Sequence, residues 1–239
     1  MVKTRIIPPA QGAHAYPLLI KSLLLSGVRQ HPGREIVYAD RLRYDYRTLN
    51  QRIHRLANLL TASGIGPGDT VALLDWDSHR SLECFFAVPM IGAVLHTVNV
   101  RLSPEQIAFT MHHAEDHLVL VHDDFLPMLE SIQETLPTVY FSHRQLVLHT
   151  LNELGTLAAH AGQSLLCSDD VYMPITPMFH VHAWGLPYVA TMLGVKQVYP
   201  GRYVPDLLLE LIAKEKVTFS HCVPTIMHML FNSPKINEI

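Results

Sequence analysis

The sequence predicts an α/β fold in which strands and helices alternate and the sheets are largely parallel. Short apolar runs recur along the chain, and most are followed by a longer segment with apolar residues at helical spacing. A helix between two consecutive strands makes the right-handed crossover that parallel pairing requires. The 239 residues, 49% of them hydrophobic, suffice to bury a core without disulfides or metals.

The first half of the chain is expected to begin with an irregular arm at 1–12 and then to alternate. Thr48 is a favourable helix N-cap, and Gly64 stops the helix that follows it. Ser103 followed by Pro104 is a second strong helix start. The expected helices cover 17–28, 48 to 64, 78 or 81 to 91, 103 onward and 124–136, and the expected strands 37–39, 43–46, 70–74, 94–98 and 117–121.

The second half continues the alternation. Apolar runs of three to five residues again precede helical patterns, several of which begin with Pro, a residue favoured in the first turn. The expected strands are 139–141, 170–174, 196–199 and 217–220, and the expected helices 144–161, 184–193, 205–214 and 224–231.

Charge and cysteine usage exclude several classes of protein. The formal net charge of −3 provides no field that attracts nucleic acid. Cys84, Cys167 and Cys222 are far apart and form no CxxC pair, which is typical of free thiols in a reducing compartment. The longest apolar run, 84–95, is shorter than the roughly 20 residues of a membrane span. We therefore expect a cytoplasmic protein with no membrane span and no nucleic-acid partner.

The 16 histidines raise the hypothesis of a metal site. Two histidine pairs have short spacings and two acidic residues lie beside the first pair, so the candidate ligands are His113, Glu115, Asp116, His117, His180 and His182. Against this, His117 is expected beyond the helix that holds His113, so the two need not share a face. The alternative is that most histidines are surface or interface groups that are neutral near pH 7.

Residues 176–185 form the segment richest in chemistry. They follow an apolar strand and open a helix, which is where open α/β sheets bind ligands. The segment combines imidazoles that suit a carboxylate or phosphate, an aromatic ring, and Gly185 for close approach. The alternative is a core aromatic beside histidines that are already hydrogen-bonded.

This segment resembles a known family. Pro177-Met178-Phe179-His180-Val181-His182-Ala183-Trp184 is similar to the P-M-F-H-V-N-A-W motif of AMP-forming fatty-acid–CoA ligases, members of the adenylate-forming superfamily. Other ordered blocks resemble that family over nearly the whole chain, among them Gly92 to Asn99, Arg101 to Ala108, His113 to Asp116, Tyr140 to Arg144, Leu211 to Phe219 and Val223 to Thr225.

The resemblance implies a fold, a reaction and a site. The chain would be part of the large N-terminal domain of such enzymes, with residues 1–139 and 140–239 as portions of its two subdomains. The reaction would join a medium- or long-chain fatty acid to coenzyme A through an acyl-adenylate, using ATP and Mg²⁺. Trp184 would be the gate between the ATP site and the acyl tunnel. The substrate-binding residues implied are His180, Val181, His182, Trp184, Val223, Pro224 and Thr225.

Two departures from the family pattern argue against activity of this chain alone. The Ser/Thr/Gly-rich phosphate loop is missing at the junction between Val139 and Tyr140, and the sequence ends at Ile239, before the family's other ATP-binding motifs and catalytic lysine. The loop is either truly deleted or was omitted from the sequence as a mobile segment. We therefore expect no catalytic or cofactor-binding residue to be assignable here.

The alternatives to an enzyme remain open. Only 16% of the residues are charged, against roughly 25% in typical soluble domains, so part of the surface is expected to be covered by a partner or by further chain. A non-catalytic module that binds acyl groups or self-associates, for example as a homodimer, is the second hypothesis. A histidine-based metal-binding protein is the third.

Overall fold

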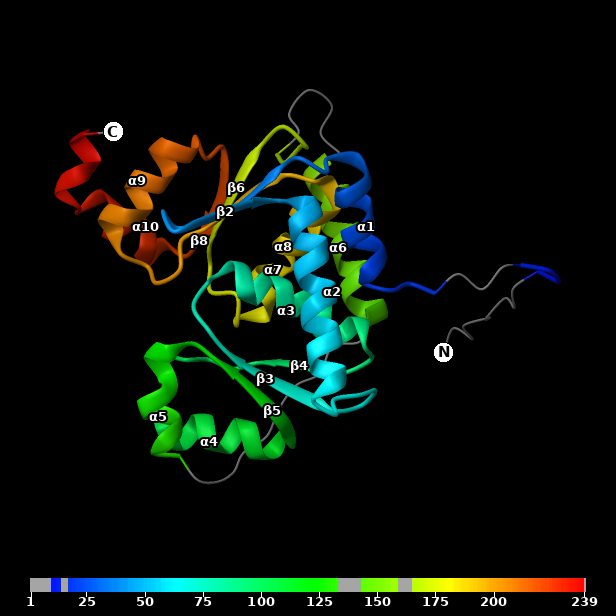
Figure 1. The fold of residues 1–239 in the computed structure, drawn as a ribbon. Coiled ribbons are helices and arrows are strands. Elements are labelled where there is room, and N and C mark those ends of the chain that lie inside the picture. Colours follow the sequence, from blue (N-terminus) through cyan, green and yellow to red (C-terminus); the bar gives the residue numbers. More distant parts are fainter. Residues whose placement is uncertain (1–9, 14–16, 133–142, 159–164, 239) are drawn as a thin grey trace, which may run out of the picture.

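The computed structural model describes residues 10–13, 17–132, 143–158 and 165–238. The described chain forms a five-stranded sheet of order β2-β1-β7-β6-β8 and a three-stranded sheet of order β4-β3-β5 (Figure 1). The strands are β1 (Glu35–Tyr38), β2 (Leu42–Asp45), β3 (Thr70–Leu74), β4 (Val94–Thr97), β5 (Asp116–Val121), β6 (Val171–Ile175), β7 (Lys196–Tyr199) and β8 (Phe219–Cys222).

All strand pairs are parallel except the β1–β2 hairpin, so the predicted α/β class is confirmed. The helices are α1 (Lys21–Gln30), α2 (Tyr46–Ala62), α3 (His79–Met90), α4 (Pro104–His113), α5 (Leu126–Glu130), α6 (His143–Ala158), α7 (Val181–Trp184), α8 (Leu186–Leu193), α9 (Pro205–Glu215) and α10 (Pro224–Phe231). None of the helices in the described part is long and apolar enough to cross a membrane.

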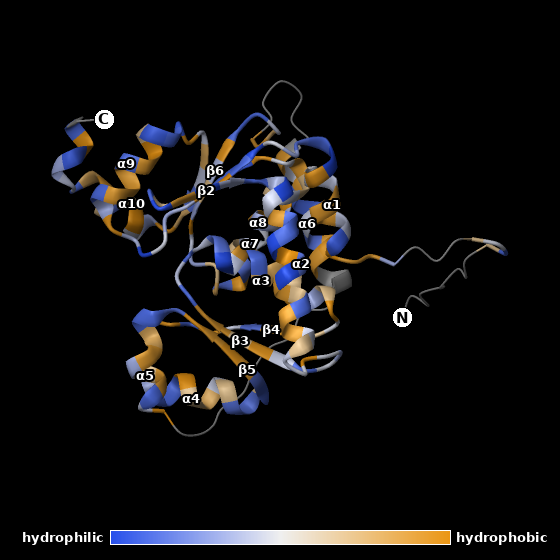
Figure 2. Ribbon diagram, viewed as in Figure 1, coloured by the Kyte–Doolittle hydropathy of each residue, from blue (hydrophilic) through white to orange (hydrophobic). Residues whose placement is uncertain are grey.

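Helices cover both faces of each sheet (Figure 1). In β3, Val71 and Leu73 pack in one cluster with residues of α2 and α3, whereas Ala72 and Leu74 pack in another with residues of α4. A strand buried on both faces reads as a continuous apolar run, which explains why this strand was predictable to the residue. Figure 2 shows the same arrangement, with hydrophobic residues concentrated along β3 and β5.

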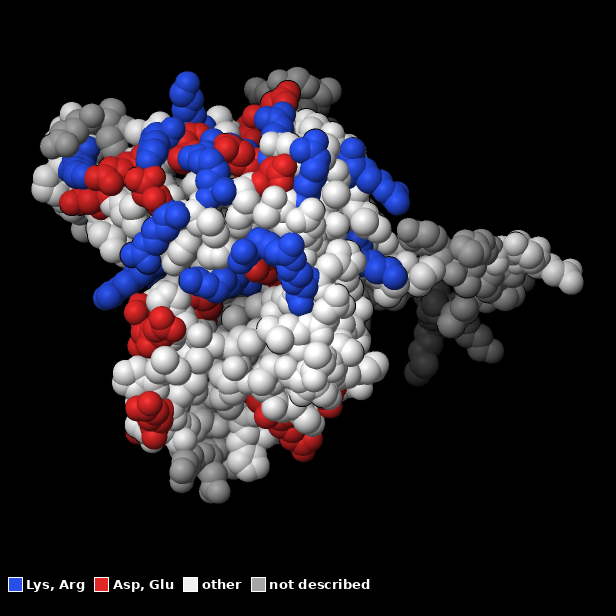
Figure 3. Space-filling view, in the orientation of Figure 1, with Lys and Arg blue, Asp and Glu red and all other residues white. Residues whose placement is uncertain are grey.

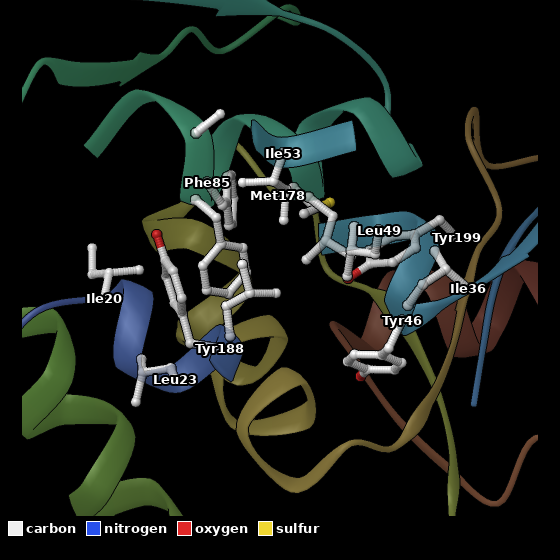
Figure 4. Packing of buried hydrophobic residues seen from close by; sticks show 14 of the residues in the cluster. Ile20, Leu23, Ile36, Tyr46, Leu49, Ile53, Phe85, Met178, Tyr188 and Tyr199 are labelled. Carbon is white, nitrogen blue, oxygen red and sulfur yellow. The ribbon is translucent and has the colours of Figure 1, made fainter. Parts of the chain in front are cut away.

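The main core lies between the five-stranded sheet and α1, α2, α3 and α8 (Figure 4). Tyr46 and Tyr188 are fully buried there. The Tyr46 hydroxyl donates to the Val195 carbonyl oxygen at 2.8 Å and accepts from the Gln197 amide at 2.7 Å, so its polar group is satisfied inside the core. Met178 belongs to this cluster, and the core therefore fixes the start of the segment that follows β6.

The prediction that Thr48 caps a helix is wrong. Asp45 is the N-cap: it has an extended backbone, and its carboxylate accepts the Thr48 N–H at 2.8 Å. Tyr46, expected in a strand, is the first residue of α2 because burying its ring against α8 outweighs its strand preference. Of the two expected helix starts, Ser78 and Ser81, Ser78 is the N-cap, and the cap predicted at Ser103 is confirmed as a complete capping box.

Other boundaries differ from expectation. The helix expected over 124–136 is a 3₁₀ turn at Asp123–Phe125 followed by α5, which ends at Glu130. β8 lies two residues later than expected, because its register with β6 pairs Tyr172 with Phe219. The expected strand 139–141, and the last three residues of the helix expected over 144–161, lie outside the described residues.

The five-stranded sheet combines distant parts of the sequence. Val37 in β1 pairs with Val198 in β7, so this sheet takes strands from both sides of residue 139. The division into portions 1–139 and 140–239 stays a prediction.

Candidate functional site

A cavity of about 240 Å³ opens where several parallel strands end. The carboxyl ends of β3, β6 and β7 lead directly into its walls, the position at which open α/β sheets bind ligands. The lining residues are Trp76, Asp77, Arg101, Pro177, Phe179, Gly201, Arg202 and Tyr203.

Asp77 ties these strand ends together. Its carboxylate accepts the Met178 N–H at 2.8 Å and the Tyr203 hydroxyl, and its carbonyl oxygen accepts the Gly201 N–H at 2.8 Å. Burial raises the pKa of Asp77 to about 7, while the two hydrogen bonds and Arg101 oppose the shift.

Two arginines give the cavity a positive wall. The Arg101 guanidinium lies 6.0 Å from the centre of the Phe179 ring and 5.9 Å from that of Tyr203, and Arg202 lies 5.7 Å from the Trp76 ring. No ion pair to either arginine occurs within the part of the chain that the structure describes. Figure 3 shows Lys and Arg side chains in a band across the face between the two sheets.

The segment after β6 turns in the left-handed sense. The helix predicted over 184–193 is present as α8, but its predicted start at Trp184 is wrong: φ is positive from Val181 to Trp184, between 47° and 58°, and α8 begins only at Leu186 after Gly185 at φ 78°. α7 is thus a left-handed turn, a conformation that costs about 1–2 kcal/mol for each L-residue. The segment tolerates this because Ala183 is fully buried and His149 Nε2 lies 2.9 Å from the Trp184 carbonyl oxygen.

Three of the expected site residues face outward. Val181 is 42% and Trp184 53% exposed, and the rings of His180 and Trp184 meet edge to face with centres 5.9 Å apart. An exposed indole at the end of a fixed turn is available to a ligand. The role of these residues in substrate binding stays a prediction.

His182 points the other way, into the core. Its Nδ1 lies 3.2 Å from the Tyr188 hydroxyl, and its ring centre lies 4.8 Å from that of Phe85. Burial lowers the pKa of His182 to about 4. The imidazole is therefore neutral near pH 7, and its placement supports packing more than contact with a substrate.

The segment 223–225 lies at the same edge of the sheet. β8 pairs with β6 up to Ile175 and Cys222, and the Thr176 hydroxyl donates to the His221 carbonyl oxygen at 3.3 Å. Val223, Pro224 and Thr225 are all exposed. Both predicted substrate-binding segments thus follow neighbouring strands, which their separation in sequence did not reveal.

The histidine metal site finds no support. His117 contacts Asp69 at 3.4 Å and accepts the Thr70 N–H at 3.3 Å, while His113 is exposed at the end of α4. His180 and His182 lie on opposite sides of the turn, one exposed and one buried. Across the described ranges, no group of three or more His, Cys, Asp or Glu side chains is arranged to hold a metal.

Asp77, Arg101 and Tyr203 were missed at the level of sequence. The available signal was an aromatic residue and an acid, Trp76 and Asp77, immediately after a buried strand. Arg101 and Tyr203 follow other strands, and only their convergence at one cavity distinguishes them from ordinary surface residues.

The family is shown by comparison with known proteins. The sequence model of the family described as AMP-binding enzyme matches residues 25–148 and 137–238. The chain therefore belongs to the AMP-binding enzyme family, and the resemblance deduced from its motifs is confirmed.

Curated relatives and solved structures agree with this assignment. The long-chain-fatty-acid–CoA ligase of Thermus thermophilus is 38% identical, over 77% of this chain and 43% of that protein. The medium-chain-fatty-acid–CoA ligase of Ectopseudomonas oleovorans is 30% identical, over 87% of this chain and 49% of that protein. The inhibitor-bound N-terminal domain of FACL13 from Mycobacterium tuberculosis has the same fold, with a TM-score of 0.78 at 19% identity over 92% of this chain and 66% of that one.

The chain spans about half the length of the curated relatives it matches. The alignment with the Ectopseudomonas enzyme runs over 274 positions, although it covers only 87% of this chain's 239 residues. The alignment therefore includes residues of that enzyme without a counterpart here.

Proposed function

We propose that this chain is the acyl-side portion of an acid–thiol ligase that activates a medium- or long-chain fatty acid through an acyl-adenylate to acyl-CoA. The observation that carries the proposal is the exposed Trp184 on a fixed left-handed turn at the carboxyl end of β6, within the motif shared with fatty-acid–CoA ligases. An indole held there can pack against an alkyl chain.

The cavity of this chain has the chemistry to hold a cosubstrate that carries phosphates. Coenzyme A carries phosphates, and the cavity offers Arg101 and Arg202 together with the rings of Trp76, Phe179 and Tyr203. We propose that coenzyme A enters by this cavity. Its thiol would supply the nucleophile that displaces AMP from the acyl group.

The elements with which the family binds the triphosphate of ATP and Mg²⁺ have no counterpart among the described residues. No acidic cluster suited to a divalent cation occurs there, and the phosphate loop of the family has no counterpart in the sequence. We therefore assign no phosphoryl-transfer step to these residues. Their part would be to bind and orient the acyl chain and the thiol.

Two measurements on the chain test this division of roles. Titration with dodecanoate should quench or shift the fluorescence of Trp184 in the Trp76→Phe variant, with saturation, whereas the separate Trp184→Phe variant, which keeps Trp76, should show no saturable response. Lack of a saturable response would contradict acyl binding. The chain alone should release no pyrophosphate from ATP when fatty acid is added, and acid-dependent release would overturn the assignment of inactivity.

A second candidate function is self-association. Val223, Met227 and Phe231 are 46%, 42% and 63% exposed and follow the four-residue spacing of one face of α10. Among the described strands, β8 beside them is an edge strand of the five-stranded sheet and pairs on one side only, with β6. A homodimer built on this face would cover both features.

The proposed location is the cytoplasm. The three cysteines are free thiols, and Cys167 is exposed. Such usage fits a reducing compartment.

A further inference from the structure

Asp77 is a buried carboxyl group that belongs to no proposed step of the reaction. It is 4% exposed, and it lies at the point where the segments after β3, β6 and β7 meet. One carboxyl oxygen accepts from Met178, at the start of the 177–184 segment, and the other from Tyr203, in the cavity wall. A single side chain thus connects the three-stranded sheet to both halves of the site.

The surroundings of Asp77 make its charge state sensitive. Arg101 favours the ionised form, whereas burial and Asp75 disfavour it, and the pKa of Asp77 rises to about 7. Burial raises the pKa of each neighbouring tyrosine, so none of them titrates in the same range. The titratable and charged groups around Asp77 are Asp75, Arg101, Tyr172, Tyr199, Arg202 and Tyr203.

Both hydrogen bonds respond to a proton. An ionised carboxylate is a pure acceptor and satisfies both donors, the Met178 N–H and the Tyr203 hydroxyl. A protonated carboxyl group can still accept from Met178 on one oxygen and turn its own hydrogen towards the Tyr203 oxygen on the other, but both bonds lose the assistance of the negative charge. Protonation therefore weakens both hydrogen bonds without removing either partner.

We propose that Asp77 is a positioning residue whose ionised carboxylate holds the 177–184 segment and Tyr203 against the cavity, and whose protonation loosens that hold. The inference rests on the proposed function, because only that function gives the 177–184 segment a role in binding. The experiments below do not depend on the proposed function, because every measurement is made without substrate.

The first readout is hydrogen exchange of the Met178 amide by NMR, expressed relative to the intrinsic rate at each pH. In the native protein, the protection of the Met178 amide against exchange should fall as pH is lowered from 8 to 6. In Asp77→Asn the amide oxygen accepts from Met178 without a charge and the NH₂ group can donate to Tyr203, as in the protonated carboxyl group, so protection should stay at the low-pH level of the native protein and lose its dependence on pH. In Asp77→Ala protection should fall about tenfold at all pH values.

The second readout is the fluorescence of Trp76, which lines the cavity, in a Trp184→Phe background where it is the sole tryptophan. A transition with a midpoint near pH 7 is expected and should vanish in Asp77→Asn. Asp75→Asn is the matched control. Asp75 is also buried and accepts the Trp76 N–H at 2.8 Å, but it has no hydrogen bond to Met178 or Tyr203, so the transition should survive.

Three outcomes would contradict the role proposed for Asp77 or leave it standing. Persistence of the transition in Asp77→Asn, or its loss in Asp75→Asn alone, would overturn the proposal. Equal protection of Met178 in the native, Asn and Ala forms would do the same. If Asp77→Ala fails to fold, the Asn variant still decides, because it keeps the shape of the side chain.

Discussion

His149 Nε2 lies 2.9 Å from the carbonyl oxygen of Trp184, and through this contact α6 holds the left-handed turn that presents the indole. The next residue, Gly185, leaves room for the imidazole: a Cβ atom there would lie 2.5 Å from His149 Cδ2. The position of the exposed tryptophan thus depends on a histidine from a distant helix and on a missing side chain.

Gly185→Ala should destabilise the protein and release Trp184. The residue has φ 78°, and its new methyl group would displace His149, so we expect a loss of about 2–4 kcal/mol in the free energy of unfolding. Urea denaturation measures this loss, and acrylamide quenching of Trp184 measures the release.

Gly155→Ala is the matched control on α6. Nothing lies within 4 Å of its added Cβ, and alanine is the better helix former, so a gain of about 0.5–1 kcal/mol is expected. Equal effects of the two substitutions would contradict the role given to Gly185.

His182 should make the protein less stable in acid. Because burial lowers its pKa to about 4 from an ordinary value near 6.5, the unfolded state binds more protons between these values. Its contribution to stability is complete above pH 6.5 and is lost as pH falls through 4. About 2 kcal/mol should disappear between pH 7.5 and 5.0.

His182→Asn should remove this part of the pH dependence. Asparagine can still hydrogen-bond the Tyr188 hydroxyl and does not titrate. Urea denaturation at both pH values compares it with the native sequence and with His180→Asn, at the exposed neighbour. If the free energy of unfolding falls equally between pH 7.5 and 5.0 in all three proteins, His182 does not cause the loss of stability in acid.

Arg101→Ala should weaken the binding of coenzyme A. The guanidinium lines the cavity without an ion pair from the described chain, so its loss should raise the Kd about tenfold and reduce the salt dependence. Isothermal titration with coenzyme A at two salt concentrations provides the measurement. Arg29→Ala, in the last turn of α1, should change neither quantity. Equal weakening by both variants would indicate non-specific attraction.

The exposed face of α10 should control association. Met227→Ser combined with Phe231→Ser removes most of the apolar area of this face and should convert a dimer to a monomer in sedimentation velocity. Leu59→Ser changes a 62% exposed leucine on α2 and should leave the oligomeric state unchanged. A native protein that is monomeric at all concentrations would contradict the proposed self-association.

The sequence by itself determined the α/β class, most of the elements, the family and the segment that carries Trp184. Strand 70–74, strand 196–199 and helix 224–231 coincide with the structure because their signals are local. A buried strand needs only a short apolar run, and a helix start needs only a cap and its first turn.

Only the tertiary structure decided the geometry of the site. Asp77 and Met178 are 101 residues apart, and they meet because β3 and β6, which belong to different sheets, end at one place. Nothing in the local pattern predicted the left-handed turn over 181–184, which contacts with His149 and the core maintain. Local propensities amount to fractions of a kcal/mol per residue, so the sum of long-range contacts overrides them where the two conflict.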